Sequence, residues 1–136
     1  MSNRVFNYKN SLEVVAIRLS KVLNEAFRKL HKEYHFNLSH EEFTILEVIK
    51  SEPGIIPIEI AREISMQRSY VCKLISKLEQ SRFVKQEEGI RGKRQIIIKN
   101  YITEKGEKEY NNILEIITQR YLTVTNKRKT RFRRTC

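Results

Sequence analysis

Side chains that can bind nucleic acid gather in two short segments of the sequence. The nine candidates for this chemistry are Gln67, Arg68, Ser69, Tyr70, Lys73, Lys77, Arg91, Lys93 and Arg94. Glutamine can bond adenine and arginine can bond guanine with two hydrogen bonds, whereas serine and the free N–H groups of a helix N-terminus can bind phosphate. This grouping predicts an interface with double-stranded DNA. The alternatives are a solvated helix face for the first segment and an ordinary charged turn for the second.

The net charge favours the same partner. The 136 residues contain 27 Lys and Arg against 16 Asp and Glu, a net charge of +11. Residues 127–136, KRKTRFRRTC, include six of these cations and no acidic residue. A polyanion is the expected partner, most simply nucleic acid, with an anionic membrane surface as the weaker option. The tail itself is expected either to neutralise phosphates without reading sequence or to be a solvated, unstructured end.

Helical spacing of apolar residues organises the first half of the chain. An amphipathic helix is expected over about residues 11–35, with Ser11 as its N-cap. It is longer than a monomer of this size needs, so part of its apolar stripe is expected to meet a partner chain. The S-x-x-E pattern at Ser39 predicts a capping box and a second helix, which ends at Glu52-Pro53-Gly54.

Residues 56–82 predict a helix-turn-helix, and residues 83–102 predict a β-hairpin. The first short helix starts near Pro57, a break follows at residues 65–67, and the second helix runs from about Arg68 to Ser81. The hairpin closes around a basic loop, GIRGKR at residues 89–94, and so has the place of a wing. Thr103 is expected to cap a final helix through about residues 121–122.

The expected fold is therefore mainly α with a small β-hairpin wing. It is a winged helix-turn-helix flanked by N- and C-terminal dimerisation helices at about 11–35 and 103–122. We expect one domain over residues 1–126 and a basic tail over 127–136. No apolar run is long enough for a membrane helix and the N-terminus has no secretory signal. With only two cysteines and no disulfide framework, a reducing cytoplasm is the expected compartment.

Several segments resemble the MarR family of bacterial transcription regulators, over roughly residues 10–122. They are NLSHEEFTILEVI, IEIAREISMQRSYVCKLISKLEQSRFV and RGKRQIIIKNYITEKG. The short, basic chain is also similar to the SarA-type regulators. The resemblance implies a homodimer that binds a pseudo-palindromic operator, with Arg94 as the wing arginine. It also implies a possible small phenolic or apolar effector in the cleft between the dimer helices and the DNA-binding lobes.

The sequence departs from the family pattern at two single positions, in two extra residues between Arg94 and Thr103, and in its C-terminal tail. Gly92 stands where an Asp normally orients the wing arginine, which predicts a looser wing tip. Arg82 replaces the usual Gly after the second helix of the helix-turn-helix. The basic tail replaces a sixth helix that ordinarily completes the dimer interface, so the geometry of the dimer is expected to differ.

Other chemistries have weaker support in the sequence. His31, His35 and His40 lie within ten residues, and the first two share a helix face as a metal pair could. We favour surface and cap histidines, and therefore no metal. Cys72 is expected to be a small packed side chain rather than a redox sensor. No G-x-S-x-G, P-loop or H-E-x-x-H motif occurs, so neither an enzyme nor a cofactor is expected.

The predicted function is a dimeric, sequence-specific double-stranded DNA-binding regulator, acting as a repressor by occluding its operator. One alternative is a non-specific architectural protein that coats DNA, which the charge and the tail favour. Another is a scaffold that binds an acidic protein partner through the tail and the first helix.

Overall fold

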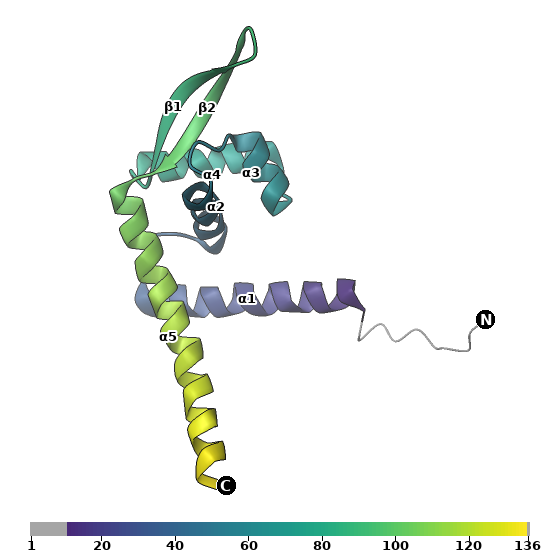
Figure 1. Cartoon of the computed structure of the whole chain (residues 1–136), viewed down its shortest axis with the longest axis vertical. Coiled ribbons are helices and arrows are strands. Elements are labelled where there is room, and N and C mark those ends of the chain that lie inside the picture. Colours follow the sequence, from purple (N-terminus) through teal and green to yellow (C-terminus); the bar gives the residue numbers. More distant parts are fainter. Residues whose placement is uncertain (1–10, 136) are drawn as a thin grey trace, which may run out of the picture. The chain divides into compact units, whose positions relative to one another are not determined.

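The computed structural model describes residues 11–135, with side chains described through residue 120. Its elements, in chain order, are α1 (Leu12–Tyr34), α2 (His40–Ser51), α3 (Pro57–Ile64), α4 (Arg68–Gln80), β1 (Val84–Arg91), β2 (Gln95–Ile102) and α5 (Glu104–Thr135) (Figure 1). This order confirms the predicted mainly α fold with a β-hairpin wing. The chain divides into two compact units, with the boundary between Phe36 and Asn37.

Helix α1 begins and ends where the sequence predicts. The hydroxyl of Ser11 accepts a hydrogen bond from the Val14 N–H at 3.2 Å. At the other end, His35 adopts a left-handed conformation with φ 56°, and its N–H bonds the carbonyl of His31. The ring of His31 lies 6.1 Å from that of Phe36, among aromatic side chains. Within the described part of the chain, no group of three or more His, Cys, Asp or Glu is arranged to hold a metal ion.

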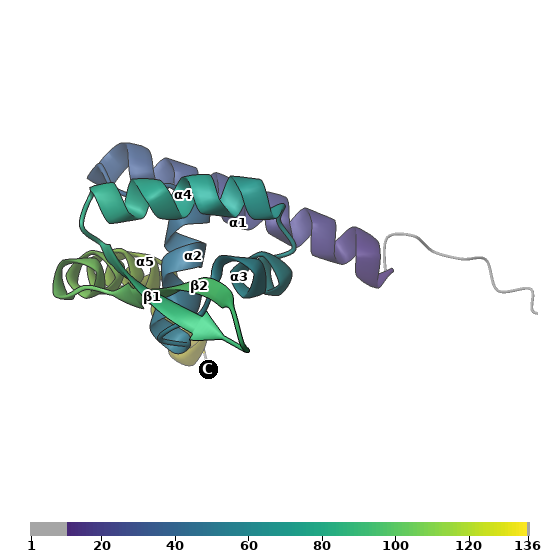
Figure 2. The same cartoon turned by 90° about the horizontal axis from the view of Figure 1, so that it is seen from above.

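The second unit is built around the apolar faces of α2 and α4. The predicted capping box is present, since the Ser39 hydroxyl accepts from the Glu42 N–H at 3.2 Å and the Glu42 carboxylate accepts from the Ser39 N–H at 3.1 Å. In Figure 2, α3, α4 and the hairpin lie around α2. The core side chains with at most 1% of their surface exposed are Leu38, Ile45, Leu46, Ile49, Ile60, Val71, Ile75, Leu78 and Ile113.

The wing is a two-stranded antiparallel hairpin whose base is fixed to the helical unit. Its register runs from Val84 opposite Ile102 to Arg91 opposite Gln95. The loop is therefore residues 92–94, shorter than the predicted loop at 89–94, because residues 89–91 pair as part of β1. At the base, the fully buried amide of Asn100 donates to the carbonyl of Ile55 at 3.1 Å.

Helix α5 starts at the predicted cap and ends later than predicted. The Thr103 hydroxyl accepts from the Gly106 N–H at 3.0 Å, as an N-cap does. The helix continues to Thr135, where the sequence predicted an end near residues 121–122. No Gly or Pro follows Gly106, so no residue type that interrupts helices stops it. The side chains of the basic tail lie outside those described.

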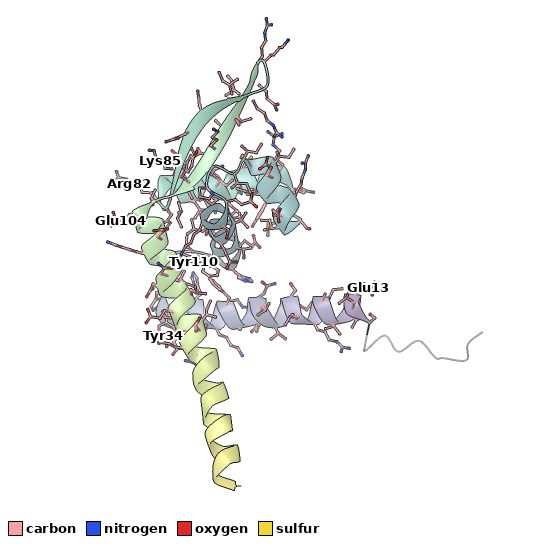
Figure 3. All side chains as sticks on the ribbon, in the orientation of Figure 1. Glu13, Tyr34, Arg82, Lys85, Glu104 and Tyr110 are labelled. Carbon is pink, nitrogen blue, oxygen red and sulfur yellow. The ribbon has the colours of Figure 1, made fainter. Side chains whose placement is uncertain are left out.

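Arg82 closes α4 in a conformation that favours glycine. The Arg82 N–H bonds the Glu79 carbonyl at 2.9 Å, and the Phe83 N–H bonds the Leu78 carbonyl at 2.9 Å. This is the Schellman arrangement, and it places Arg82 at φ 65°. Arg82 lies between α4 and the hairpin, near the start of α5 (Figure 3). Because a side chain at positive φ is strained, the arginine at this position destabilises the fold.

We expect Arg82→Gly to raise the free energy of unfolding by about 1 kcal/mol. Glycine relieves the strain of the left-handed conformation, and this gain exceeds the free-energy cost of the greater conformational entropy that glycine gives the unfolded chain. Urea denaturation followed by circular dichroism measures it as a higher midpoint with an unchanged slope. Arg82→Ala is the matched control, because it removes the same charge and keeps the strain. An equal gain in both variants would assign the effect to the removal of the arginine side chain and contradict the argument.

Candidate nucleic-acid interface

Helix α4 separates a buried face from a polar, exposed one. The buried residues Val71, Leu74, Ile75 and Leu78 hold it against the core. The candidate side chains on α4 and at its N-cap are all exposed: Gln67, Arg68, Ser69, Tyr70, Lys73 and Lys77. Gln67 makes no side-chain hydrogen bond to the first turn. The N-terminal N–H groups of α4 are therefore left without that cap, at the end of the helix predicted to enter a groove.

Tyr70 joins the N-terminal ends of α4 and α2. Its hydroxyl donates to the carboxylate of Glu41, in the first turn of α2. This hydrogen bond, together with partial burial, raises the pKa of the Tyr70 hydroxyl. The hydroxyl thus has a protein partner already, while the residue as a whole is 41% exposed. The sequence did not indicate Glu41, because nothing in its spacing marks it as a neighbour of a residue 29 positions later.

The basic candidates of the wing lie at and beside the hairpin loop. Arg91, Lys93 and Arg94 are all exposed, and Gly92 takes a left-handed φ of 67°. The Arg91 guanidinium lies 3.6 Å from the carboxylate of Glu59 in α3, which links the wing to the helix-turn-helix. An exposed pair of this kind stabilises little. Among the described residues, the side chains of the other two make no hydrogen bond or ion pair.

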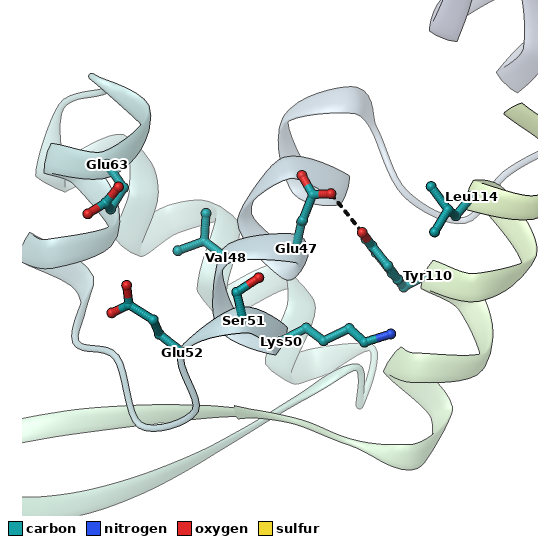
Figure 4. Close-up of a pocket in the computed structure, with 8 residues that line it drawn as sticks. All are labelled: Glu47, Val48, Lys50, Ser51, Glu52, Glu63, Tyr110 and Leu114. Atoms are coloured by element: carbon teal, nitrogen blue, oxygen red, sulfur yellow. Dashed lines mark hydrogen bonds between the residues drawn. The ribbon is translucent and has the colours of Figure 1, made fainter. Parts of the chain in front are cut away.

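A separate pocket opens beside α2 and α5. It has a volume of about 570 Å³ and is lined by Glu47, Val48, Lys50, Ser51, Glu52, Glu63, Tyr110 and Leu114 (Figure 4). The Tyr110 hydroxyl donates to Glu47 at 2.7 Å, and its ring stacks on Phe43 with centroids 4.9 Å apart. Burial and that hydrogen bond raise the pKa of Tyr110 to about 12. The lining of the pocket carries three carboxylates and one amine, so the pocket has a net negative charge.

The comparisons with known proteins agree with this geometry. The model of the MarR family matches residues 36–95, which contain all nine candidate residues. Residues 36–95 are therefore similar to the MarR family, over the segment that contains the helix-turn-helix and most of the wing. No curated protein sequence matches the chain.

Solved structures of regulators share the fold. The transcriptional regulator SlyA is 23% identical, with 92% of this chain and 94% of that one covered and a TM-score of 0.57. Apo MarR from E. coli is 16% identical, with 92% and 87% covered and a TM-score of 0.67. Staphylococcus aureus MarR, solved with salicylate and kanamycin, is 19% identical, with 81% and 78% covered and a TM-score of 0.58.

The chain therefore shares the winged-helix fold of these transcription regulators. No helix in the described part of the chain is both long and apolar enough to cross a membrane.

Proposed function

We propose that this chain is a regulator of the MarR type, which binds double-stranded DNA sequence-specifically as a homodimer and represses by occluding its operator. The observation that carries the proposal is the exposure of all nine candidate side chains on α4 and the wing. The exposed face of α4 would enter the major groove, where Gln67 and Arg68 can read base edges. The wing tip would reach the adjacent minor groove, where arginine is favoured by the negative potential.

Helix α1 supports the dimer in this proposal. Its apolar side chains at positions 12, 15, 19, 22 and 23 fall on one face and are all exposed. A contiguous exposed apolar stripe of this kind is typical of a protein–protein contact. Two recognition helices related by a twofold axis would meet major grooves about one helical turn apart, so the operator would be a pseudo-palindrome.

A small-molecule effector is the remaining part of the proposal. To change DNA binding, a ligand must favour one arrangement of the two DNA-binding lobes over another. The pocket beside Tyr110 is large enough for a small molecule, and its carboxylates disfavour an anionic ligand. A neutral or cationic molecule fits this pocket better than a phenolate or carboxylate.

The test compares binding to the region upstream of the protein's own gene with binding to a random duplex of equal length. The salt concentration is about 150 mM, because electrostatic attraction alone gives only weak binding there. We expect a preference of about a thousandfold or more for a regulator of this kind. Equal affinity for both duplexes would favour the architectural alternative. Binding to neither would favour a scaffold for an acidic protein partner.

Lys73→Ala is expected to weaken binding to specific and random duplexes alike, because an exposed lysine on α4 neutralises a phosphate without reading a base. The slope of log K against log salt should fall by about 0.9 for each phosphate that the variant no longer neutralises. Anisotropy titrations over a salt series measure both quantities. Lys108→Ala, which removes the same charge from the exposed surface of α5, should leave the slope unchanged. Equal slopes for wild type and Lys73→Ala would remove Lys73 from the interface.

A further inference from the structure

The tip of the wing carries an exposed apolar pair. Ile90 is 76% exposed and Ile96 is 68% exposed, more than any other large hydrophobic side chain described in the second unit. The two residues are direct partners across the strands, so their side chains emerge on the same face of the hairpin. An isoleucine pair in this position leaves apolar surface in water, which a binding partner would cover.

The charges around this pair identify the class of partner. Three cations lie at the adjoining turn, Arg91, Lys93 and Arg94, and no acidic residue occurs between Gly89 and Thr103. A basic turn beside an apolar pair is complementary to a polyanion that also offers apolar surface. Duplex DNA does so in its minor groove, where phosphates line the edges and sugars and base steps form the walls and floor.

Resting on the proposed function, we propose that Ile90 and Ile96 form an apolar wedge that enters the minor groove beside the site of α4 and bends the DNA. Apolar side chains inserted at a base step unstack it in part and kink the duplex toward the major groove. The cations of the turn hold the flanking phosphates. Specificity at this flank then comes from how easily the step deforms, which favours TA and CA steps.

The next cross-strand pair on the same face of the hairpin limits how deeply the wing can enter the minor groove. Glu88 pairs with Ile98 two residues behind Ile90, on the same face. A carboxylate there repels the phosphates, so only the Ile90–Ile96 row enters the groove. A β-branched pair across two strands also stabilises a hairpin by itself. The experiment must therefore keep strand propensity while it removes apolar surface.

The double variant Ile90→Thr/Ile96→Thr meets this need, because threonine is β-branched and strand-favouring but polar at its tip. The control is Ile97→Thr, which makes the same change at a half-buried neighbour on the other face. The probe is a duplex enriched from a random library by the full-length wild-type protein. It carries end labels for energy transfer and 2-aminopurine at the flanking step.

We expect wild type and Ile97→Thr to bend this duplex by about 20–90° and to increase 2-aminopurine fluorescence. The double variant should lose both signals and bind about tenfold more weakly. Replacing the flanking TA step by a stiff A-tract should weaken wild type and leave the double variant unchanged.

Tight binding by wild type with no bend, or an equal bend in wild type and the double variant, would overturn the wedge and leave the proposed function intact. Enrichment of no duplex at all would overturn both. Loss of the bend in Ile97→Thr as well would assign it to hairpin stability and also overturn the wedge.

Discussion

Gly106→Ala is expected to destabilise the protein by about 3 kcal/mol or more, although alanine is the better helix former by about 1 kcal/mol. A Cβ built on Gly106 would lie 2.2 Å from the carbonyl oxygen of Phe83 and 2.9 Å from the Ile102 side chain. The Phe83 carbonyl cannot withdraw freely, because it accepts the Thr103 N–H at 3.0 Å. The first turn of α5 would have to move away and break its contacts with the segment between α4 and the wing.

The cost should extend to the cap of α5. The Thr103 hydroxyl accepts from the Gly106 N–H at 3.0 Å and donates to the Arg82 carbonyl at 2.6 Å. Displacing the first turn disturbs both hydrogen bonds, so the variant should unfold at a much lower urea concentration than wild type, measured by circular dichroism.

Gly89→Ala is the matched control, since the atom nearest to its Cβ is the flexible Lys99 Cε at 2.8 Å. It should change stability by less than about 1 kcal/mol. Equal losses at the two glycines would show that the close approach to Phe83 is not what makes Gly106 necessary.

The elements that were predictable from the sequence are those set by local chemistry. Ser39 and Glu42 form the capping box that their spacing indicates, and Pro57 begins α3 in the first turn, where a missing N–H costs nothing. The apolar stripe of α4 is buried as its periodicity predicts. In each case the residues that decide the structure lie within one or two helical turns of each other.

The features that the sequence did not reveal depend on residues far apart in the chain. The Tyr70–Glu41 hydrogen bond and the Arg91–Glu59 ion pair join separate elements, and no local pattern marks either. The hairpin loop was predicted too long because Gly89 is a turn-favouring type, yet it pairs with Ile97. The end of α5 was predicted too early for a different reason. The apolar spacing that marks this helix ends before the helix does, and no Gly or Pro in the sequence indicates where the helix stops.

Leu19→Glu/Val22→Glu is expected to convert the proposed dimer to monomers and to weaken operator binding by about 100-fold or more, because two linked half-site contacts become one. Leu19 is 55% exposed and Val22 is 62% exposed on the same face of α1. Two carboxylates there would have to be buried, unpaired, against the partner chain. Glutamate is a good helix former, so α1 itself should persist. Sedimentation velocity and anisotropy titration measure the two effects.

Ile17→Glu separates disruption of the interface from the added charge. Ile17 is 59% exposed, as much as its neighbours, but lies two residues before Leu19 and so about 200° around the helix axis. This variant should remain a dimer and bind DNA as wild type does, apart from the small penalty of one carboxylate near a polyanion. A double variant that stays dimeric would show that the stripe on α1 does not hold the dimer together. If the Ile17→Glu variant also dissociates, the dimer contact is not confined to the stripe. Carboxylates on opposite sides of α1 can both disrupt the dimer only if atoms of the partner chain cover both sides of the helix.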